Sequence, residues 1–475
     1  MTDVRPPSTG GGPPATALTA DDLARLTGGR LLRRSDRQIR GGAVDSRDVA
    51  PGQLFVALPG EHTDGHRFLG EAVARGAAAL LVTREPDGLD EQADVTVVRV
   101  PDGLAALWAV GAGWRARFTP LVVGVTGSIA KTSTKEAVAA VLARRFRTLR
   151  SEGNRNNEIG LPLTLLELDA AHEAAVLEMG MYTGGEIADL ARIARPQIGV
   201  VTAVQPVHLS RIGSIEAIER AKAELVEALP ADGTAVLNAD DPRVRAMAGR
   251  TDARVVTYGF TPDADVTADD VASAGLAGMR FTLRTARGST PVAIPTLGRL
   301  AVHNALAAAA VGLAAGMSVH DIAAGLADGW AAPHRSEVIR LSGVTIVDDS
   351  YNASPASVAA ALELLSGLAG RRVAVLGEML ELGEGHEAGH RAVGAEAASV
   401  ADLLVVVGRP AAGIAAAARE HGLDPGRVIE VADRDAARDA LVPRLRDGDV
   451  VLVKASRGSA LDLLVDALRT DLADR

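Results

Sequence analysis

The chain has 475 residues, of which 47% are hydrophobic and 3% aromatic, and its formal net charge at pH 7 is −10. This length and apolar content predict two to four domains and exclude a mainly disordered chain, while the acidic balance and the few aromatic residues argue against nucleic acid as a partner. The chain contains no cysteine, which excludes disulfides, thiolate metal sites and a cysteine nucleophile. Without an apolar run of membrane length, we expect a soluble, cytoplasmic protein with no membrane insertion.

The first part of the chain predicts a small α/β domain. Residues 1–16 are polar and rich in Pro and Gly, so we expect a disordered tail and not a secretory signal. A domain over residues 17–118 follows, because short apolar runs alternate with a helical pattern there. Its predicted strands are Leu54–Leu58, Ala79–Val82 and Val95–Val98, and its predicted helices include Arg67–Arg75.

The middle of the chain, residues 119–333, predicts a nucleotide-binding α/β domain. The strand Leu121–Thr126 leads through a Gly-containing turn into a helix over Lys131–Phe146. Further strands at Ala174–Met179, Ile198–Ala203 and Ala235–Asn238 are separated by helix-length segments, so the sheet should be mostly parallel. Gly275–Pro295 indicates hairpin strands, and Ala301–Gly329 is helical. Ala331-Ala332-Pro333 breaks this pattern and is a plausible linker.

Residues 334–475 predict a second doubly wound, Rossmann-like domain. Strands and helices alternate along it, as a parallel sheet with helices on both faces requires. The predicted strands are Thr345–Asp348, Val373–Leu376, Leu403–Val407 and Val450–Val453. The sequence therefore predicts a three-domain α/β protein.

The sharpest chemical signal is the turn Gly124-Val-Thr-Gly-Ser-Ile-Ala-Lys131-Thr132. Backbone N–H groups at the start of the helix would cradle phosphate oxygens, Lys131 would reach the terminal phosphates, and Thr132 would hold Mg²⁺. A merely structural turn is the alternative. Ala130 stands where such loops usually have glycine, so a positive φ there would carry a steric cost, and glycine should then tighten ATP binding. The residues expected to bind ATP through this loop are Thr126, Gly127, Ser128, Ile129, Ala130, Lys131, Thr132 and Ser133.

Two polar residues follow neighbouring strands of the predicted sheet. Glu178 closes the strand Ala174–Met179, and His208 follows Ile198–Ala203 after a short loop. Both should lie at the carboxyl edge beside the phosphate loop. Each could be structural when taken alone, but together they provide the oxygen and imidazole donors of a Mg²⁺ site.

Two further features are ambiguous from the residues alone. The loop Ser151–Glu158 contains Asn154, Asn156 and Asn157, whose carboxamides suit a polar substrate as well as a solvated turn. Lys222 lies three residues after Glu219 on a predicted helix over Ile215–Leu229. That spacing alone favours a surface ion pair of little energetic value.

Several ordered motifs together resemble the Mur ligases over nearly the whole chain. These are Asp45-Ser-Arg47, Asp64-Gly-His66, Thr126 to Glu136, Glu152-Gly-Asn-Arg-Asn-Asn-Glu-Ile-Gly160, Glu178-Met-Gly180, Asp348-Asp-Ser-Tyr-Asn-Ala353, Leu376-Gly-Glu-Met-Leu-Glu-Leu382 and Lys454-Ala-Ser-Arg-Gly458. The resemblance implies an N-terminal domain for a uridine nucleotide substrate, a central ATPase domain and a C-terminal domain. It also implies an amide ligase that uses ATP to convert a peptide carboxylate into an acyl phosphate, which an amine then attacks.

The resemblance also implies roles for individual residues. Glu178 and His208 become Mg²⁺ ligands, and Lys222 becomes a lysine that carbamylation converts into a metal-binding anion, which reverses the interpretation as a surface ion pair. Arg335 is expected near the nucleotide, where it could stabilise phosphoryl charge. Asn304 and Asp349 are expected there as well. The residues expected to contact or shape the uridine nucleotide site are Ser46, Arg47, Asp64 and His66. Asn352, Lys454 and Arg457 lie on C-terminal turns, where they could face the incoming dipeptide or ATP.

Within the family, Asp349-Ser-Tyr-Asn-Ala353 favours the members that add D-alanyl-D-alanine to UDP-N-acetylmuramoyl-tripeptide. We expect the protein to act as a monomer. The diaminopimelate-adding members typically carry Asn-Pro-Arg, which this chain lacks. The alternatives are a diaminopimelate- or lysine-adding ligase, a polyglutamate ligase, and a catalytically weakened nucleotide-binding paralogue. Ile129-Ala130, where the family usually has Asn-Gly, and Ala203-Val-Gln-Pro206 motivate the last of these.

Overall fold

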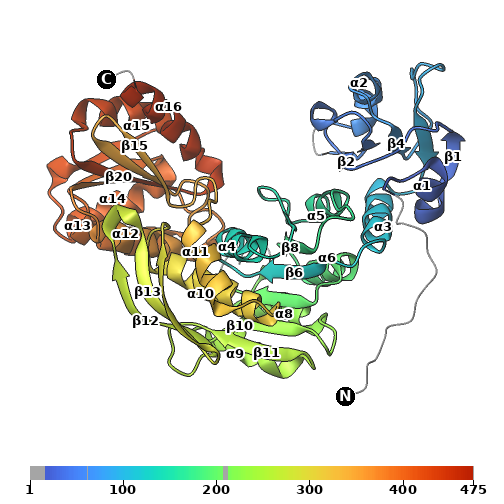
Figure 1. The fold of residues 1–475 in the computed structure, drawn as a ribbon. Helices are drawn as coiled ribbons and strands as arrows, with labels where there is room; N and C mark the ends of the chain where they lie inside the picture. Colours follow the sequence, from blue (N-terminus) through green and yellow to red (C-terminus); the bar gives the residue numbers. More distant parts are fainter. Residues whose placement is uncertain (1–15, 61–62, 207–211, 474–475) are drawn as a thin grey trace. The chain divides into compact units, whose positions relative to one another are not determined.

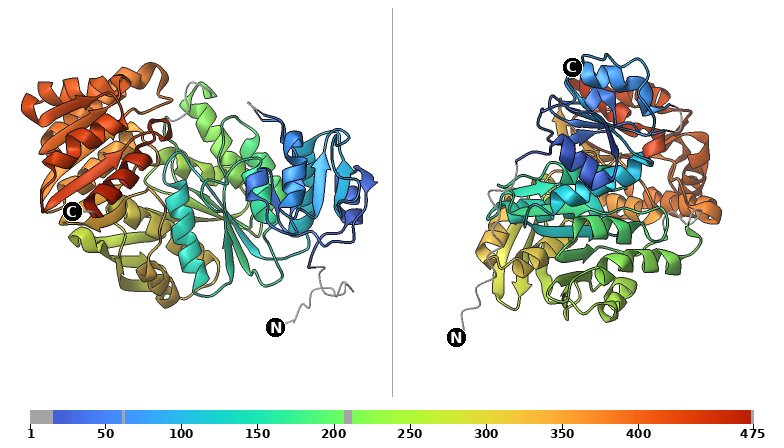
Figure 2. Two further views of the ribbon diagram at one scale, coloured as in Figure 1. Left: turned by 90° about the horizontal axis from the view of Figure 1, so that it is seen from above. Right: turned by 90° about the vertical axis from the view of Figure 1, so that its right-hand side faces the viewer.

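The chain forms two compact units in the computed structural model, which describes residues 16–60, 63–206 and 212–473. Unit one comprises Met1–Val122, Arg147–Leu177 and Asp189–Arg195, and unit two comprises Val123–Phe146, Glu178–Ala188 and Pro196–Arg475. Figure 1 follows the chain from blue at the N-terminus to red at the C-terminus, and Figure 2 adds two views. The predicted tail, apart from Thr16, lies outside the described residues, and the predicted boundaries at 118 and 333 stay predictions.

Unit one contains a five-stranded sheet of order β1-β5-β4-β3-β2. Its strands are parallel except for β1, which pairs antiparallel with β5. Strands β3 and β4 are buried throughout, as the continuous apolar runs in their sequences predict. The elements of this region are α1 Ala20–Thr27, β1 Arg30–Arg33, β2 Gly42–Ala43, β3 Leu54–Val56, α2 Leu69–Ala74, β4 Ala79–Val82, β5 Thr96–Arg99 and α3 Gly103–Arg115.

The central sheet has nine strands in the order β14-β13-β12-β11-β10-β9-β6-β8-β7. The pairs from β6 through β9 and β10 to β11 are parallel, whereas β12, β13 and β14 pair antiparallel. Its strands are β6 Leu121–Thr126, β7 Thr148–Arg150, β8 Ala174–Glu178, β9 Ile198–Val201, β10 Thr234–Asn238, β11 Arg254–Tyr258, β12 Val266–Ser273, β13 Met279–Thr285 and β14 Gly288–Ile294. The helices of this part of the chain are α4 Lys131–Ala143, α5 Gly160–Leu165, α6 Glu186–Ala194, α8 Ile215–Glu227, α9 Pro242–Ala246, α10 Arg299–Ala314 and α11 Val319–Asp328.

The last part of the chain forms a six-stranded sheet of order β15-β16-β20-β17-β18-β19, which we call the C-terminal sheet. All its strands are parallel except β15, the antiparallel partner of β16. Helices α12, α13 and α14 pack on one face and helices α15 and α16 on the other, each with its own apolar core. The elements are β15 Glu337–Leu341, β16 Val344–Asp348, α12 Pro355–Ser366, β17 Arg371–Gly377, α13 His386–Val400, β18 Leu403–Val407, α14 Ala412–Glu420, β19 Val428–Val431, α15 Arg434–Leu441, β20 Asp449–Lys454 and α16 Leu461–Ala473.

The predicted α/β fold class is confirmed, and the buried strands agree best with the sequence. Strands β4, β6 and β18 match their predicted ranges residue for residue. The predicted helix Arg67–Arg75 begins instead as a 3₁₀ turn, Gly65–Phe68, before α2. The predicted hairpin Gly275–Pro295 is present as β13 and β14, but β12 also pairs with it and was not predicted.

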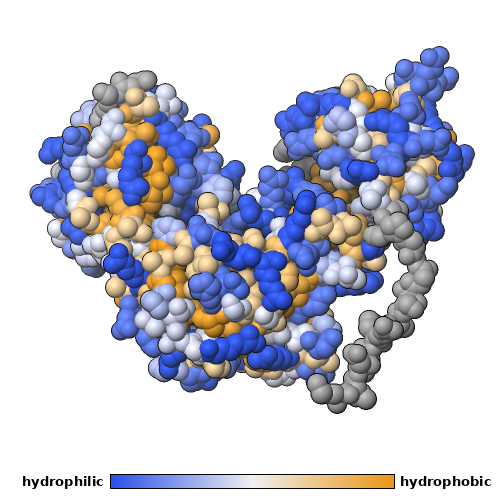
Figure 3. Space-filling model, viewed as in Figure 1, coloured by the Kyte–Doolittle hydropathy of each residue, from blue (hydrophilic) through white to orange (hydrophobic). Residues whose placement is uncertain are grey.

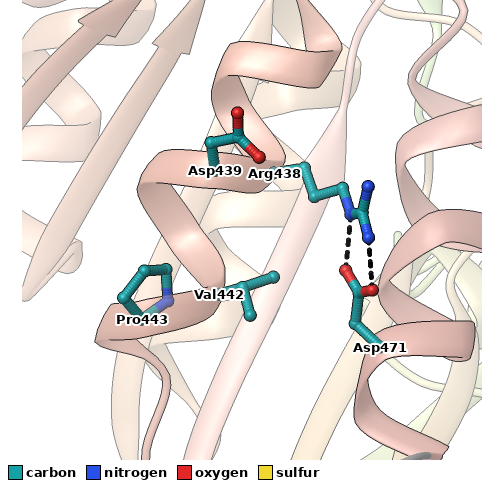
Figure 4. A pocket seen from close by; sticks show the side chains of 5 residues that line it. All are labelled: Arg438, Asp439, Val442, Pro443 and Asp471. Atoms are coloured by element: carbon teal, nitrogen blue, oxygen red, sulfur yellow. Dashed lines mark hydrogen bonds and ion pairs between the residues drawn. The ribbon is translucent and has the colours of Figure 1, made fainter.

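Hydrophilic and hydrophobic residues are both visible at the surface. On the face shown in Figure 3, hydrophilic residues are interrupted by hydrophobic ones on the C-terminal part at the left and on the central part of the molecule. None of the described helices combines the length and the apolar character that a membrane span requires. A surface pocket on the C-terminal part, shown in Figure 4, is lined by Arg438, Asp439, Val442, Pro443 and Asp471. Its Arg438 and Asp471 bind each other through two hydrogen bonds, so the pair joins α15 to α16.

Candidate active site

The turn between β6 and α4 has the geometry of a phosphate loop. Gly127 has a φ of 148°, and a Cβ at this position would lie 1.8 Å from the Oγ1 of Thr202, so only glycine fits. Thr202 in turn donates its hydroxyl to the carbonyl of Ile129 at 2.6 Å. Ser128 donates its backbone N–H to Ala203 at 2.8 Å and its hydroxyl to Gln205 at 3.1 Å. The loop is therefore held against the segment that follows β9.

Ala130 occupies the N-cap position of α4 in a left-handed conformation, with φ 63° and ψ 4°. The condition stated from the sequence is thus met: this position requires a positive φ, and a methyl group stands where glycine would be unstrained. Its carbonyl still accepts the first helical hydrogen bond from Thr134 at 2.8 Å. The loop keeps its shape despite the substitution, at the cost of local backbone strain.

Lys131, Thr132 and Glu178 meet at the carboxyl edge of the central sheet. Thr132 is buried, and its hydroxyl donates to Oε2 of Glu178 at 2.8 Å, which joins the start of α4 to the end of β8. Lys131 donates its Nζ to the carbonyl of Gly127 at 2.7 Å. Burial lowers the pKa of Lys131, Glu178 partly opposes that effect, and Arg335 adds to it. A lysine in this setting gains from an anionic partner, and phosphate oxygens would provide one.

The hard oxygen donors of this site fit Mg²⁺, which prefers carboxylate, hydroxyl and phosphate oxygens. The hydroxyl of Thr132 and the carboxylate of Glu178 already lie within hydrogen-bond distance of each other. Thr126, the last residue of β6, donates its hydroxyl to the carbonyl of Met179 at 2.8 Å, so it fixes the main chain that follows Glu178. Ser133 is half-buried one residue further along α4. His208, the other predicted ligand, lies outside the described residues.

Lys222 is buried inside unit two, with 3% of its surface exposed. The interpretation as a surface ion pair with Glu219 is wrong, because Glu219 instead accepts a hydrogen bond from Arg243 at 2.7 Å. Burial, and then the positive charge of Lys131, hold the pKa of Lys222 well below its usual value. A depressed pKa favours the neutral amine of a buried lysine, and this is the form that reacts with carbon dioxide to give a carbamate.

The three residues expected around the adenine nucleotide come from separate elements of unit two. Asn304, on α10, is buried and accepts a hydrogen bond from the hydroxyl of Thr134 at 3.1 Å, which ties it to α4. Arg335 lies between two residues with positive φ, and its guanidinium stacks 4.1 Å from the ring centre of Tyr351. Asp349 accepts a hydrogen bond from the backbone N–H of Ser336 at 3.1 Å.

The C-terminal residues Asn352, Lys454 and Arg457 differ in how exposed they are. Lys454 is 3% exposed and donates its Nζ to Asp349 at 2.6 Å and to the carbonyl of Asn352 at 2.9 Å. Arg457 is exposed, and its guanidinium lies 5.3 Å from the ring centre of Tyr351. Lys454 thus holds the loop after β16 in place, whereas the exposed Arg457 pairs with Asp462 at 3.5 Å.

The residues expected to shape the uridine nucleotide site lie in unit one and form two hydrogen-bonded groups. Ser46 is buried and donates to Glu71 at 2.8 Å, and the exposed Arg47 pairs with Asp45. Asp64 accepts hydrogen bonds from the backbone N–H of His66 at 2.9 Å and from Arg84 at 2.7 Å, and these lower its pKa. The imidazole of His66 accepts the backbone N–H of Thr83 at 2.9 Å, so it is fixed by both neighbours.

The three asparagines of the loop Ser151–Glu158 in unit one differ in their hydrogen bonds and exposure. Asn157 accepts the backbone N–H groups of Ile159 at 3.3 Å and Gly160 at 2.9 Å, so it supports the start of α5. Asn156 donates to the side chain of Asn154 at 2.6 Å, and Asn154 is exposed. Asn154 and Asn156 are therefore the pair that a polar ligand could reach.

Three features of unit two were not predicted as part of the site. Tyr351 belongs to the sequence motif Asp348–Ala353 but was not predicted as a site residue. The guanidinium groups of Arg335 and Arg457 both lie near its ring. His303 lies 3.1 Å from Asn238 and 3.3 Å from Asp240 and stacks near two aromatic rings. His334, Glu337 and Asp348 are of residue types that can bind a metal ion, and they lie close together. Nδ1 of His334 lies 2.7 Å from Oδ2 of Asp348, and Glu337 pairs with Arg469. No spacing rule in the sequence would have connected the members of the last two groups.

Comparison with known proteins places the chain in a family. Three family models match it: "Mur ligase family, catalytic domain" at residues 38–115, "Mur ligase middle domain" at 125–312, and "Mur ligase, glutamate ligase domain" at 334–457. The chain belongs to the Mur ligase family, and its phosphate loop lies in the part that the middle-domain model matches.

Its relatives narrow the comparison to one kind of Mur ligase. The chain is 40% identical to the UDP-N-acetylmuramoyl-tripeptide–D-alanyl-D-alanine ligase of Mycobacterium tuberculosis (strain ATCC 25618 / H37Rv), covering 96% of this chain and 98% of that protein. Identity to the ligase of the same name from Escherichia coli (strain K12) is 37%, covering 95% and 98%. A crystal structure of MurF from Acinetobacter baumannii superposes with a TM-score of 0.86 at 30% identity, covering 97% and 100%. MurF from Thermotoga maritima in complex with ADP gives 0.80 at 29% identity, covering 92% and 98%.

Proposed function

We propose that this protein is an ATP-dependent amide ligase that adds D-alanyl-D-alanine to UDP-N-acetylmuramoyl-tripeptide and releases ADP and phosphate. The product is the pentapeptide precursor of peptidoglycan, so the enzyme supports cell-wall synthesis, cell shape and cell division. The relatives at 37% and 40% identity over nearly the whole chain bear that activity in their names. The observation that carries the proposal is the phosphate loop before α4. Beside Lys131, the hydroxyl of Thr132 donates to Oε2 of Glu178, at the end of β8, at 2.8 Å.

The residues of the loop explain how the terminal phosphate of ATP is held. Backbone N–H groups at the start of α4, together with Lys131, bind phosphate oxygens, and the helix dipole adds a favourable field. Arg335, whose charge acts on Lys131, is available to stabilise charge that develops on the transferring phosphoryl group. Asn304 and Asp349 complete the nucleotide site in this proposal.

The peptide carboxylate attacks the γ-phosphorus of ATP, and the bond to the leaving ADP oxygen breaks. The amine of D-alanyl-D-alanine then adds to the carbonyl carbon of the acyl phosphate. Collapse of the tetrahedral adduct forms the amide and expels phosphate. Because both steps build negative charge on oxygen, the cationic side chains and N–H groups of this edge lower both barriers.

Mg²⁺ would be held by Thr132 and Glu178, with His208 and a carbamylated Lys222, and would neutralise charge on the phosphoryl oxygens. The depressed pKa of Lys222 supports this assignment, because a neutral amine is the form that reacts with carbon dioxide. In unit one, Ser46, Arg47, Asp64 and His66 are proposed to bind the uridine nucleotide, and Asn154, Asn156 and Asn157 the peptide. We also propose that the enzyme acts as a monomer in the cytoplasm.

A coupled assay of ADP release tests the proposal. Release should require both UDP-N-acetylmuramoyl-tripeptide and D-alanyl-D-alanine, and a panel of amines should separate this ligase from its diaminopimelate-, lysine- and glutamate-adding relatives. Lys131→Ala should abolish turnover. Dipeptide-independent hydrolysis, or no turnover with any amine, would count against the ligase and favour a weakened nucleotide-binding paralogue.

A further inference from the structure

Arg335 carries its positive charge close to another cation. Besides the burial of Lys131, the charge of Arg335 lowers the pKa of that lysine, so the two side chains lie near each other at the phosphate loop. Arg335 is half-buried, and it forms no ion pair with any of the residues that the structure describes. Because like charges repel, Lys131 favours rotation of the guanidinium away from the loop. A neighbour that attracts the guanidinium would offset this repulsion.

The ring of Tyr351 is such a neighbour. The guanidinium carbon of Arg335 lies 4.1 Å from the centre of this ring, well within the distance of about 6 Å at which an aromatic face attracts a guanidinium. Burial raises the pKa of Tyr351, Arg335 opposes that effect and Glu178 adds to it, so the phenol is neutral at pH 7. The guanidinium of Arg457 lies further from the ring centre, at 5.3 Å. Tyr351 therefore offers its face mainly to Arg335.

The main chain on both sides of Arg335 is tied to the loop that carries Tyr351. His334 and Ser336 have φ values of 58° and 55°, a left-handed conformation that L-residues seldom adopt without support. The carbonyl of His334 accepts the backbone N–H of Tyr351 at 3.1 Å. The backbone N–H of Ser336 donates to Oδ1 of Asp349 at 3.1 Å. These two hydrogen bonds fix the position from which the side chain of Arg335 starts.

The loop that carries Tyr351 is in turn anchored to the end of β16. Asp348 is fully buried, and its Oδ1 accepts the backbone N–H and the hydroxyl of Ser350 at 3.1 Å and 2.6 Å. Lys454, at the end of β20, donates its Nζ to Oδ2 of Asp349 at 2.6 Å. The ring of Tyr351 is thus held by the main chain of a loop that two strands support.

We infer that Tyr351 is a positioning residue, whose ring holds the guanidinium of Arg335 beside the phosphate loop by a cation–π contact. The inference rests on the proposed function, in which Arg335 stabilises the charge of the transferring phosphoryl group. It requires the ring of Tyr351 and not its hydroxyl, and it requires that Tyr351 act through Arg335.

The test is a double-mutant cycle that combines Tyr351→Leu with Arg335→Ala. Tyr351→Phe is the conservative variant, because it keeps the ring and removes only the hydroxyl. Phe146→Leu is the matched control, since Phe146 has Arg145 at 5.2 Å from its ring centre but lies beyond the C-terminal end of α4, away from the phosphate loop. Product formation is followed with radiolabelled D-alanyl-D-alanine, which keeps slow variants measurable, and kcat and the KM for ATP are determined for each protein.

Tyr351→Leu should lower kcat about 3- to 30-fold, the range expected for the loss of one cation–π contact. The KM for ATP should not change, because the contact orients Arg335 for the transition state and adds nothing to binding of the ground state. Tyr351→Phe should retain most of the wild-type kcat, and Phe146→Leu should retain all of it. In the Arg335→Ala background, Tyr351→Leu should lower kcat no further.

Two results would overturn the inference. If Tyr351→Leu lowers kcat by the same factor with and without Arg335, Tyr351 acts independently of that arginine. If Tyr351→Phe loses as much activity as Tyr351→Leu, the hydroxyl and not the ring is responsible. A wild-type protein that forms no product from the dipeptide would instead refute the proposed function, and the inference would fail with it.

Discussion

Replacing Ala130 by glycine should stabilise the protein. Ala130 has φ 63° and ψ 4° at the N-cap of α4, and a left-handed conformation costs an L-residue about 1–2 kcal/mol that glycine does not incur. Glycine also gains freedom in the unfolded chain, which offsets about 0.4–1 kcal/mol of that advantage. The balance favours Ala130→Gly by about 1 kcal/mol in the free energy of unfolding, or about 2–4 °C in Tm for a domain of this size.

The assay is thermal and urea unfolding of the wild-type protein and the variant, with Ala140→Gly as a control. Ala140 lies inside the same helix, α4, where glycine should instead destabilise by about 0.5–1 kcal/mol. The two substitutions remove the same methyl group and should shift Tm in opposite directions. A Tm for Ala130→Gly equal to or below that of the wild-type protein would refute the reasoning that Ala130 is strained.

Three further predictions concern the same site. Gly127→Ala should lower the free energy of unfolding more than Gly185→Ala does. A Cβ at position 127 would lie 1.8 Å from Thr202 Oγ1, whereas a Cβ at position 185 would have nothing within 4 Å. Equal losses of stability in urea unfolding would contradict this. Thr132→Val keeps the shape of the side chain but loses the hydroxyl that contacts Glu178. We expect kcat to fall about 100-fold, which corresponds to about 3 kcal/mol of transition-state stabilisation. Binding of the uridine nucleotide substrate, measured by calorimetry, should be unchanged. Because the pKa of Lys222 is lower in the folded than in the unfolded chain, the unfolded state binds more protons, and this lysine makes the free energy of unfolding rise with pH up to about 10.4. Lys222→Met should flatten that rise in the range just below about pH 10.4, and an identical slope would show that Lys222 does not titrate in this way.

The strand and helix around the phosphate loop could be predicted because their signals are local. Leu121–Thr126 is a mainly apolar run, and the helix begins at Lys131, directly after the Gly-containing turn. The sequence also indicated that Ala130 could have a positive φ, since glycine is the usual residue at this position of the loop. These features depend on neighbours in the chain and not on distant contacts.

The environment of Lys222 could not be predicted from its spacing. The interval to Glu219 describes an exposed pair on a helix, but the burial of Lys222 depends on how α8 packs in unit two, and Glu219 pairs with Arg243 from a later segment. The family resemblance, and not local physics, pointed to its importance. Strand β12 was missed because Val266–Ser273 contains two consecutive aspartates, so its sequence lacks the apolar–polar alternation of a strand.

The contacts at the carboxyl edge of the C-terminal sheet depend on topology. Glu378 belongs to a motif visible in the sequence, but the hydrogen bond that its carbonyl accepts from Ser456 follows from β17 and β20 being neighbours although more than seventy residues separate them. Nothing local indicates that order. Sequence motifs therefore identified chemically active segments, and the strand order determined which of them lie together.

In the proposed function, the peptide carboxylate is activated by direct transfer of the γ-phosphoryl group of ATP. Preparing UDP-N-acetylmuramoyl-tripeptide with ¹⁸O in its terminal carboxylate and measuring the phosphate released on ligation tests this most directly. Each phosphate should carry one ¹⁸O atom from the carboxylate, because the acyl phosphate breaks at its carbon–oxygen bond. Unlabelled phosphate released together with the amide product would contradict it.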